Sequence, residues 1–239
     1  MEFLQGVKIT VRYDEMSPLD RAIDGYYKKA RKYFADLNVA EKAAPDVRAK
    51  RKIELDNVRK HLEHERRLME NIVDVQAQLE LYREYGRGSV HKAGVDRATS
   101  DQRLTELLAE EHHPTAILAK FMRAVPIPKP STNHTAHHIS PGKGKTRHAY
   151  RAPMMLHVLG IRINDPDNGV WLLSKTKHAP HWSMPDSLGH LQYHTEGYEK
   201  WVADKLRRVS GEEFARMQLK LIGLALQQNK LPPEARKKV

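Results

Sequence analysis

Residues 136–141 read Ala-His-His-Ile-Ser-Pro, and this stretch decides the fold and the site that the sequence predicts. Side chains alternate between the two faces of an extended segment, so adjacent histidines there point in opposite directions. His137 and His138 are therefore expected to have separate roles. One ring could bind a metal ion while its neighbour reaches a different point, for instance a water molecule.

Three further pieces follow the histidine pair. A helix-like segment surrounds residues 154–159, and an Asn-Gly turn at 168–169 precedes a buried strand at 170–173. His190 and His194 are four residues apart, which places both on one face if the segment is helical, a spacing used for helical metal ligands. Together the pieces predict strand, turn, strand and helix converging on a cation held by histidines.

Histidine ligands around a divalent ion would suit cleavage of a phosphodiester bond. The barrier comes from negative charge that builds on the phosphate and on the leaving oxygen, and a divalent ion stabilises both. A neutral imidazole can take the proton from the attacking water. No carboxylate pair or Ser/His/Asp order is evident here, so other hydrolytic chemistries have less support. The chain has no cysteine, which excludes thiolate ligands and cysteine nucleophiles.

At these residues the sequence resembles the AHH nucleases, a branch of the HNH/endonuclease VII group with the ββα-metal fold. The similarity covers residues 130–210, with matches at 136–141, 160–170, His190, His194 and Tyr198. The resemblance implies a hydrolase, a metal-dependent endonuclease. The expected fold class is α+β and mostly α. An N-terminal helical hairpin or coiled-coil-like region precedes an HNH-like nuclease domain with C-terminal helices.

The resemblance also implies a role for each matching side chain. His138 would be the general base that activates water. Asn168 would tie the hairpin loop together by hydrogen bonding and so help orient His138. His137, His190 and His194 would bind one divalent metal ion.

The segment 174–189 departs from the family pattern as an insertion that carries His178 and His181. Either histidine could replace or supplement His190, so both are secondary candidates for metal ligands. The identity of the ion stays open between Mg²⁺, Mn²⁺, Zn²⁺ and Ni²⁺, because sites rich in histidine accept several divalent ions and geometry decides between them.

The positive charge of the chain is concentrated in its second half. The formal net charge is +11, and residues 127–239 hold 18 Lys and Arg against 9 Asp and Glu. A basic segment attracts polyanions, of which nucleic acid is the commonest. DNA is favoured over RNA only by the habits of the fold. The side chains expected to contact nucleic acid are Lys143, Lys145, Arg147, Lys175 and Lys177.

Composition divides the chain into parts. Proline occupies every second position from 126 to 130, which cannot continue a helix, so residues 126–132 are expected to form a semi-rigid linker. Apolar spacing of three and four over residues 45–85 predicts one long helix that needs a partner in a hairpin or coiled coil. The expected parts are a helical region at 1–125 for packing, interaction or delivery, the linker, a nuclease domain at 133–230 and a basic tail at 231–239.

Helix ends are indicated by local polar patterns. Ser17-Pro18 is typical of a helix start, and the helix is expected to reach about Leu37. Capping-box spacing is found at Thr99 with Gln102 and at Ser210 with Glu213. Beyond the second box, a closing amphipathic helix is predicted from Phe214, Met217, Leu221 and Leu224.

Partners and location are expectations from the resemblance. Family members are usually toxin domains of secreted bacterial effectors that a cognate immunity protein neutralises in the producer. We therefore expect synthesis in the bacterial cytoplasm and export into target cells by a dedicated secretion system, with an adaptor as a further partner. No stretch approaches the roughly 18–20 apolar residues of a membrane span, so no membrane insertion is expected.

Two other functions remain open. The chain could be a nonenzymatic nucleic-acid-binding protein whose histidines hold a structural metal ion. It could also be an interaction module in which the long helices are the functional part and the basic domain is an accessory.

Overall fold

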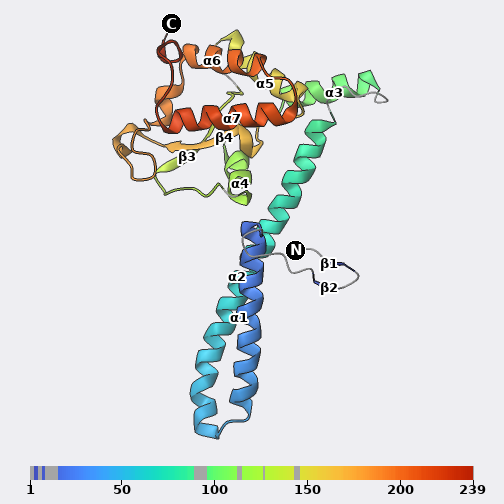
Figure 1. The fold of residues 1–239 in the computed structure, drawn as a ribbon, viewed down its shortest axis with the longest axis vertical. Helices are drawn as coiled ribbons and strands as arrows, with labels where there is room; N and C mark the ends of the chain where they lie inside the picture. Colours follow the sequence, from blue (N-terminus) through green and yellow to red (C-terminus); the bar gives the residue numbers. More distant parts are fainter. Residues whose placement is uncertain are drawn as a thin grey trace. The chain divides into compact units, whose positions relative to one another are not determined.

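The computed structural model describes residues 3–4, 7–8, 16–88, 96–111, 115–125, 127–142 and 146–238 (Figure 1). These residues form mostly helices with two small sheets, which confirms the predicted α+β, mostly helical class. The chain divides into two compact units, Met1–Asp74 and Val75–Val239. The predicted boundaries at residues 125, 132 and 230 stay predictions, and Pro126 lies outside the described residues.

The first unit holds α1 (Pro18–Glu41), the first part of α2 (Pro45–Arg87), and two short antiparallel strands, β1 (Phe3–Leu4) and β2 (Val7–Lys8). The hydroxyl of Ser17 accepts a hydrogen bond from the backbone N–H of Asp20 at 3.1 Å, as the predicted helix start requires. An ion pair of 2.6 Å between Lys29 and Glu65 joins α1 to α2, which lie side by side (Figure 1).

The second unit holds the remaining elements. No described helix is long and apolar enough to cross a membrane. The longer elements are α3 (Arg97–Leu108), α4 (Ala116–Ala124), β3 (His134–His138), α5 (Arg147–Val158), β4 (Gly169–Leu173), α6 (Glu196–Arg207) and α7 (Glu212–Gln227). Short 3₁₀ turns lie at η1 (Pro166–Asn168), η2 (Thr176–His178), η3 (His190–Tyr193) and η4 (Pro233–Arg236).

Strands β3 and β4 pair antiparallel, with His137 opposite Val170 and His138 opposite Gly169. The sheet is buried on both faces. Val170 belongs to the larger hydrophobic core. On the opposite face, Trp171 packs with Ala136 and with residues of α4. Strand β3, which carries both histidines, is therefore held from both sides of the sheet.

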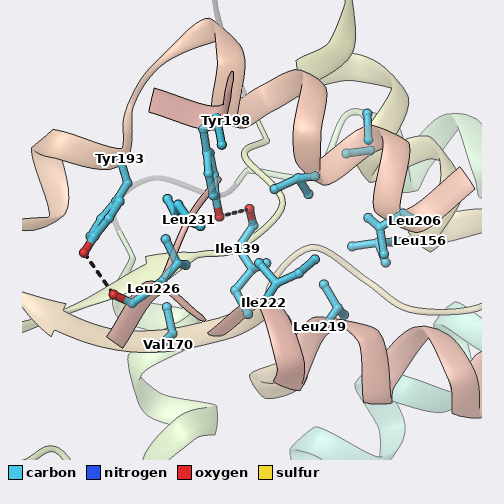
Figure 2. Packing of buried hydrophobic residues seen from close by; sticks show 14 of the residues in the cluster. Ile139, Leu156, Val170, Tyr193, Tyr198, Leu206, Leu219, Ile222, Leu226 and Leu231 are labelled. Atoms are coloured by element: carbon cyan, nitrogen blue, oxygen red, sulfur yellow. Dashed lines mark hydrogen bonds between the residues drawn. The ribbon is translucent and has the colours of Figure 1, made fainter. Parts of the chain in front are cut away.

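The larger core joins the end of β3 to the last helices (Figure 2). Ile139, directly after β3, contributes its side chain to this core and its carbonyl oxygen accepts a hydrogen bond of 2.7 Å from the hydroxyl of Tyr198 on α6. The hydroxyl of Tyr193 donates to the carbonyl oxygen of Leu226 on α7 at 2.9 Å. These bonds anchor β3, η3 and the C-terminal helices to one another.

Both predicted capping boxes are wrong. Helix α3 is capped one turn earlier, by the carboxylate of Asp96, which accepts from the backbone N–H of Thr99 at 3.1 Å. Helix α7 follows Gly211, whose φ of 89° is a conformation that glycine adopts readily, and no side-chain cap of α7 is found there. A polar residue three positions before a Gln or Glu is a weak signal when a second acceptor lies close by.

Helix α7 was predicted correctly, but its predicted apolar stripe does not face the core. Its buried residues are Ala215, Leu219, Ile222, Gly223 and Leu226. The predicted stripe is about half exposed at each position, namely Phe214, Met217, Leu221 and Leu224. Because α7 has apolar residues on two faces, periodicity alone could not select the buried one.

Candidate active site

Three histidine rings lie together beside the end of β3. The centroid of the His137 ring lies 5.1 Å from that of His194 and 6.3 Å from that of His190, and the latter two are 5.7 Å apart. His137 is buried, with 5% of its surface exposed. The structure thus brings together the three side chains that the resemblance implies as metal ligands.

The reason predicted for the closeness of His190 and His194 is wrong. They do not share a face of an α-helix, because η3 spans His190–Tyr193, His194 follows it, and α6 begins at Glu196. A 3₁₀ turn has three residues per turn, so positions four apart do not align on it. The rings approach because the chain turns between η3 and α6, where Thr195 caps α6 by accepting from the N–H of Tyr198 at 3.1 Å.

His190 is held by the segment that follows β4. Its Nδ1 lies 3.0 Å from the carbonyl oxygen of Ser174, which can only accept, so Nδ1 carries the proton and Nε2 the lone pair. The preceding Gly189 allows the close approach, since a Cβ there would lie 2.5 Å from the backbone nitrogen of Thr176. A backbone carbonyl bonded to one nitrogen is the usual partner of a histidine that ligates through the other.

The three rings fit a divalent ion by their chemistry. Three imidazoles around one tetrahedral ion have ring centroids about 5 Å apart, given metal–nitrogen distances of about 2 Å. The pair of His137 and His194 has this separation, whereas the distances to His190 are larger. As placed, no three His, Asp or Glu side chains among the described residues converge closely enough to hold an ion. The distances between the His190 ring and the other two rings are therefore larger than in a closed coordination sphere.

His138 points away from this group, as strand alternation predicts. Its Nε2 lies 2.9 Å from Oδ1 of Asn164, and the contact is buried. The amide nitrogen of Asn164 donates at 3.0 Å both to Oε1 of Glu110 and to the carbonyl oxygen of Glu111. Asn164 and Glu110 were not predicted as site residues. Asn164 lies within the matching motif, but no local signal in the sequence links Glu110 to it.

Asn168 is fully buried and reaches backbone groups on both sides of the hairpin. Its Oδ1 accepts from the N–H of Ser140 at 2.8 Å, and its Nδ2 donates to the carbonyl oxygen of Ile163 at 2.8 Å. It therefore ties the segment after β3 to the segment before β4. A role of Asn168 in catalysis stays a prediction.

His181, one of the two secondary candidates for metal ligands, lies beside His134. The ring of His181 is 4.7 Å from that of His134, and Ser131 and Ser183 each contact both rings at 2.9–3.4 Å. Burial, followed by the charge of His181 and more weakly that of His178, lowers the pKa of His134. His181 thus lies against His134, and the role of His178 and His181 as ligands stays a prediction.

The predicted nucleic-acid contacts are partly described. Arg147, the first residue of α5, lines a cavity of about 660 Å³. Its charged lining holds four other cations and three carboxylates, namely Lys200, Lys205, Arg208, Lys237, Glu196, Asp204 and Glu234. Lys175 and Lys177 are exposed at η2. Lys143 and Lys145 lie outside the described residues. Their contacts with nucleic acid stay predictions.

With the strand pair and the three histidines established, the class of the domain comes from a comparison with protein families. Residues 118–221 match the family AHH, described as a nuclease family of the HNH/ENDO VII superfamily with conserved AHH. This segment of the chain, from α4 to α7, is therefore similar to the AHH nuclease family. Comparisons with curated proteins and with solved structures found no match.

Proposed function

We propose that the protein is a metal-dependent endonuclease that hydrolyses phosphodiester bonds of nucleic acid, with DNA as the favoured substrate. One observation carries the proposal. Strand β3 directs His137 into a group of three imidazoles and the adjacent His138 to the opposite side, against Asn164. A ligand and a base on neighbouring residues suit the ββα-metal fold, to which we assign β3, β4 and α6.

The residues of the site divide the chemical work. His137, His190 and His194 would hold the ion, which stabilises the negative charge that develops on the phosphate and on the leaving oxygen. His138 would accept the proton of the attacking water. Its ring is buried and bonded to the side chain of Asn164, so it does not have to be oriented during the reaction.

The charge of the second half supports the substrate class. The excess of nine positive charges in residues 127–239 would bring nucleic acid to the site through the phosphate backbone. Contacts of this kind, including those of Arg147, Lys175 and Lys177, would give weak sequence preference and strong salt dependence.

The decisive test is cleavage of plasmid DNA and of RNA with Mg²⁺, Mn²⁺, Zn²⁺, Ni²⁺ or EDTA. We expect cleavage that EDTA abolishes. His138→Ala should lower kcat by about 10²–10⁴-fold with binding retained, the usual contribution of a general base. His137→Ala should weaken metal binding measured by calorimetry. His64→Ala is the control, because His64 is exposed on α2, and it should behave as wild type.

The same experiment separates the alternative. If wild-type protein binds DNA and metal but leaves every phosphodiester bond intact, the chain is a nonenzymatic nucleic-acid-binding protein with a structural ion. If the protein binds neither, the function lies elsewhere, and the helices α1 and α2 become the place to look.

We further propose that the protein is an antibacterial toxin effector, exported from the bacterial cytoplasm by a secretion system and neutralised by a cognate immunity protein. The helical hairpin of α1 and α2 would contact an adaptor or the immunity protein. The excess positive charge of residues 127–239 suits an acidic inhibitor. Expression of the full chain in bacteria should be toxic, and His138→Ala should abolish toxicity. Survival of cells that express active wild-type enzyme would contradict the toxin role.

A further inference from the structure

A buried series of hydrogen bonds reaches His138 from residues that precede the segment matched by the family. Asn164 contacts Nε2 of His138 through its amide oxygen and Glu110 through its amide nitrogen. Its backbone N–H donates to the hydroxyl of Tyr82 on α2 at 2.9 Å. Tyr82 in turn donates to the same oxygen of Glu110. Tyr82, Glu110 and Asn164 therefore form a closed ring of hydrogen bonds behind His138.

The ring decides which way the amide of Asn164 faces. Its nitrogen lies 3.0 Å from two groups that can only accept, a carboxylate oxygen of Glu110 and the carbonyl oxygen of Glu111. A reversed amide would place its oxygen against both acceptors and lose both bonds. The oxygen of Asn164 must therefore face His138, and Nε2 of His138 must donate to it.

Glu110 is itself fixed from its other side. Its Oε2 accepts from Nε of Arg162 at 2.9 Å, and the side chains of Glu110 and Arg162 are 12% and 19% exposed. The guanidinium of Arg162 lies 3.9 Å from the centroid of the Tyr82 ring. Burial and the charge of Glu110 raise the pKa of Tyr82, so its hydroxyl keeps the proton that it donates. We call the hydrogen bonds among Tyr82, Glu110 and Asn164 the clamp. Each of these bonds has one consistent donor and one consistent acceptor.

We propose that Asn164, Glu110 and Tyr82 are positioning residues that hold neutral His138 in the tautomer with the proton on Nε2 and the lone pair on Nδ1. The proposal rests on the proposed function, in which His138 is the general base. It assigns Nδ1 as the atom that receives the proton of water. It also makes α2 and the segment after α3 part of the catalytic apparatus.

The first test reads the tautomer directly and needs no activity. Protein labelled with ¹⁵N in the histidine rings is studied by two-bond ¹⁵N–¹H correlation at alkaline pH with metal removed by chelation. The His138 signals are those that disappear in His138→Ala. We expect Nε2 to show the shift of a protonated nitrogen and Nδ1 that of an unprotonated one. In Asn164→Ala the two shifts should move toward each other as the tautomers mix.

The second test separates positioning from stability with two matched tyrosines. Tyr82 and Tyr85 lie on the same helix and each donates to a glutamate, Glu110 and Glu106 respectively, but only Tyr82 reaches Asn164. Tyr82→Phe should lower kcat by about 3–10-fold and Asn164→Ala by about 10–100-fold, below the effect of removing the base itself. KM for DNA should not change. Tyr85→Phe should retain wild-type kcat.

The outcomes distinguish this inference from the proposed function. If His138→Ala abolishes cleavage but Asn164→Ala and Tyr82→Phe keep wild-type kcat, the clamp has no catalytic role and the nuclease assignment stands. An Nδ1-protonated His138 in the wild type would also overturn the clamp. If His138→Ala cleaves as the wild type does, the proposed function fails. Should Asn164→Ala not fold, Tyr82→Phe and the wild-type tautomer still decide.

Discussion

Replacement of Asn168 by alanine should destabilise the second unit strongly, although Asn168 makes no contact with a reacting group. Its amide satisfies the N–H of Ser140 and the carbonyl oxygen of Ile163, each at 2.8 Å. Both residues are almost completely buried. Water cannot replace the lost partners without entering the core, so both backbone groups would stay unsatisfied.

The magnitude follows from the two groups. A buried donor or acceptor left without a partner costs about 1–3 kcal/mol, so the pair predicts a loss of about 2–6 kcal/mol in unfolding free energy. Asn168→Asp should be similarly destabilising at neutral pH. It keeps an acceptor for Ser140 but loses the donor to Ile163 and buries a charge.

Urea denaturation followed by tryptophan fluorescence is the suitable assay. All three tryptophans, Trp171, Trp182 and Trp201, belong to the unit Val75–Val239, so the signal reports on this unit alone. Gln192→Ala removes an exposed amide of the same unit and should change the free energy by less than about 0.5 kcal/mol. A loss below about 1 kcal/mol for Asn168→Ala would refute the argument that this amide holds the hairpin together.

Three other predictions concern pH, buried charge and salt. Burial lowers the pKa of His157 to about 4. The neutral ring therefore stabilises the fold fully above pH 6.5, and this contribution is lost as the pH falls toward 4. His157→Leu should flatten the pH dependence of the unfolding free energy by up to about 3 kcal/mol. Arg216→Met should cost about 3 kcal/mol in urea denaturation, because Asp165, 1% exposed and 2.9 Å from Arg216, would lose a partner. The double variant Lys175→Ala/Lys177→Ala should reduce the slope of log Kd against log salt by about 2 for any DNA sequence, and an unchanged slope would exclude both from the interface.

The predicted division of work between His137 and His138 depends only on local geometry. Alternation along a strand holds wherever the strand is placed, so the sequence predicted opposite directions for the two rings, and the structure has them. The predicted position of His190 and His194 on one α-helix was wrong, because it depended on where the helix begins and not on local geometry alone. Their spacing matched an α-helix, but Thr195 caps α6 only after both residues, and the chain turns before the helix begins.

The buried face of α7 shows a different limit. Phe214, Met217, Leu221 and Leu224 have the spacing of a core-facing stripe, as do Leu219, Ile222 and Leu226 on the other side. Both faces of α7 therefore have the spacing of a core-facing stripe. Ile139 and Val170 lie against Gly223, so the face of Leu219, Ile222 and Leu226 is the buried one. A helix with two apolar faces needs its neighbours to select one.

By itself the sequence determined the histidine pair, its place on a strand, the strand and turn that face it, and the nuclease family of residues 118–221. These follow from residues close together in the chain, where alternation, turn chemistry and motif spacing operate. Only the tertiary structure decided which side chain holds His138. Asn164 is bonded to Glu110 and Tyr82 across separations of 54 and 82 residues, and packing of distant segments, which no local pattern records, brings them together.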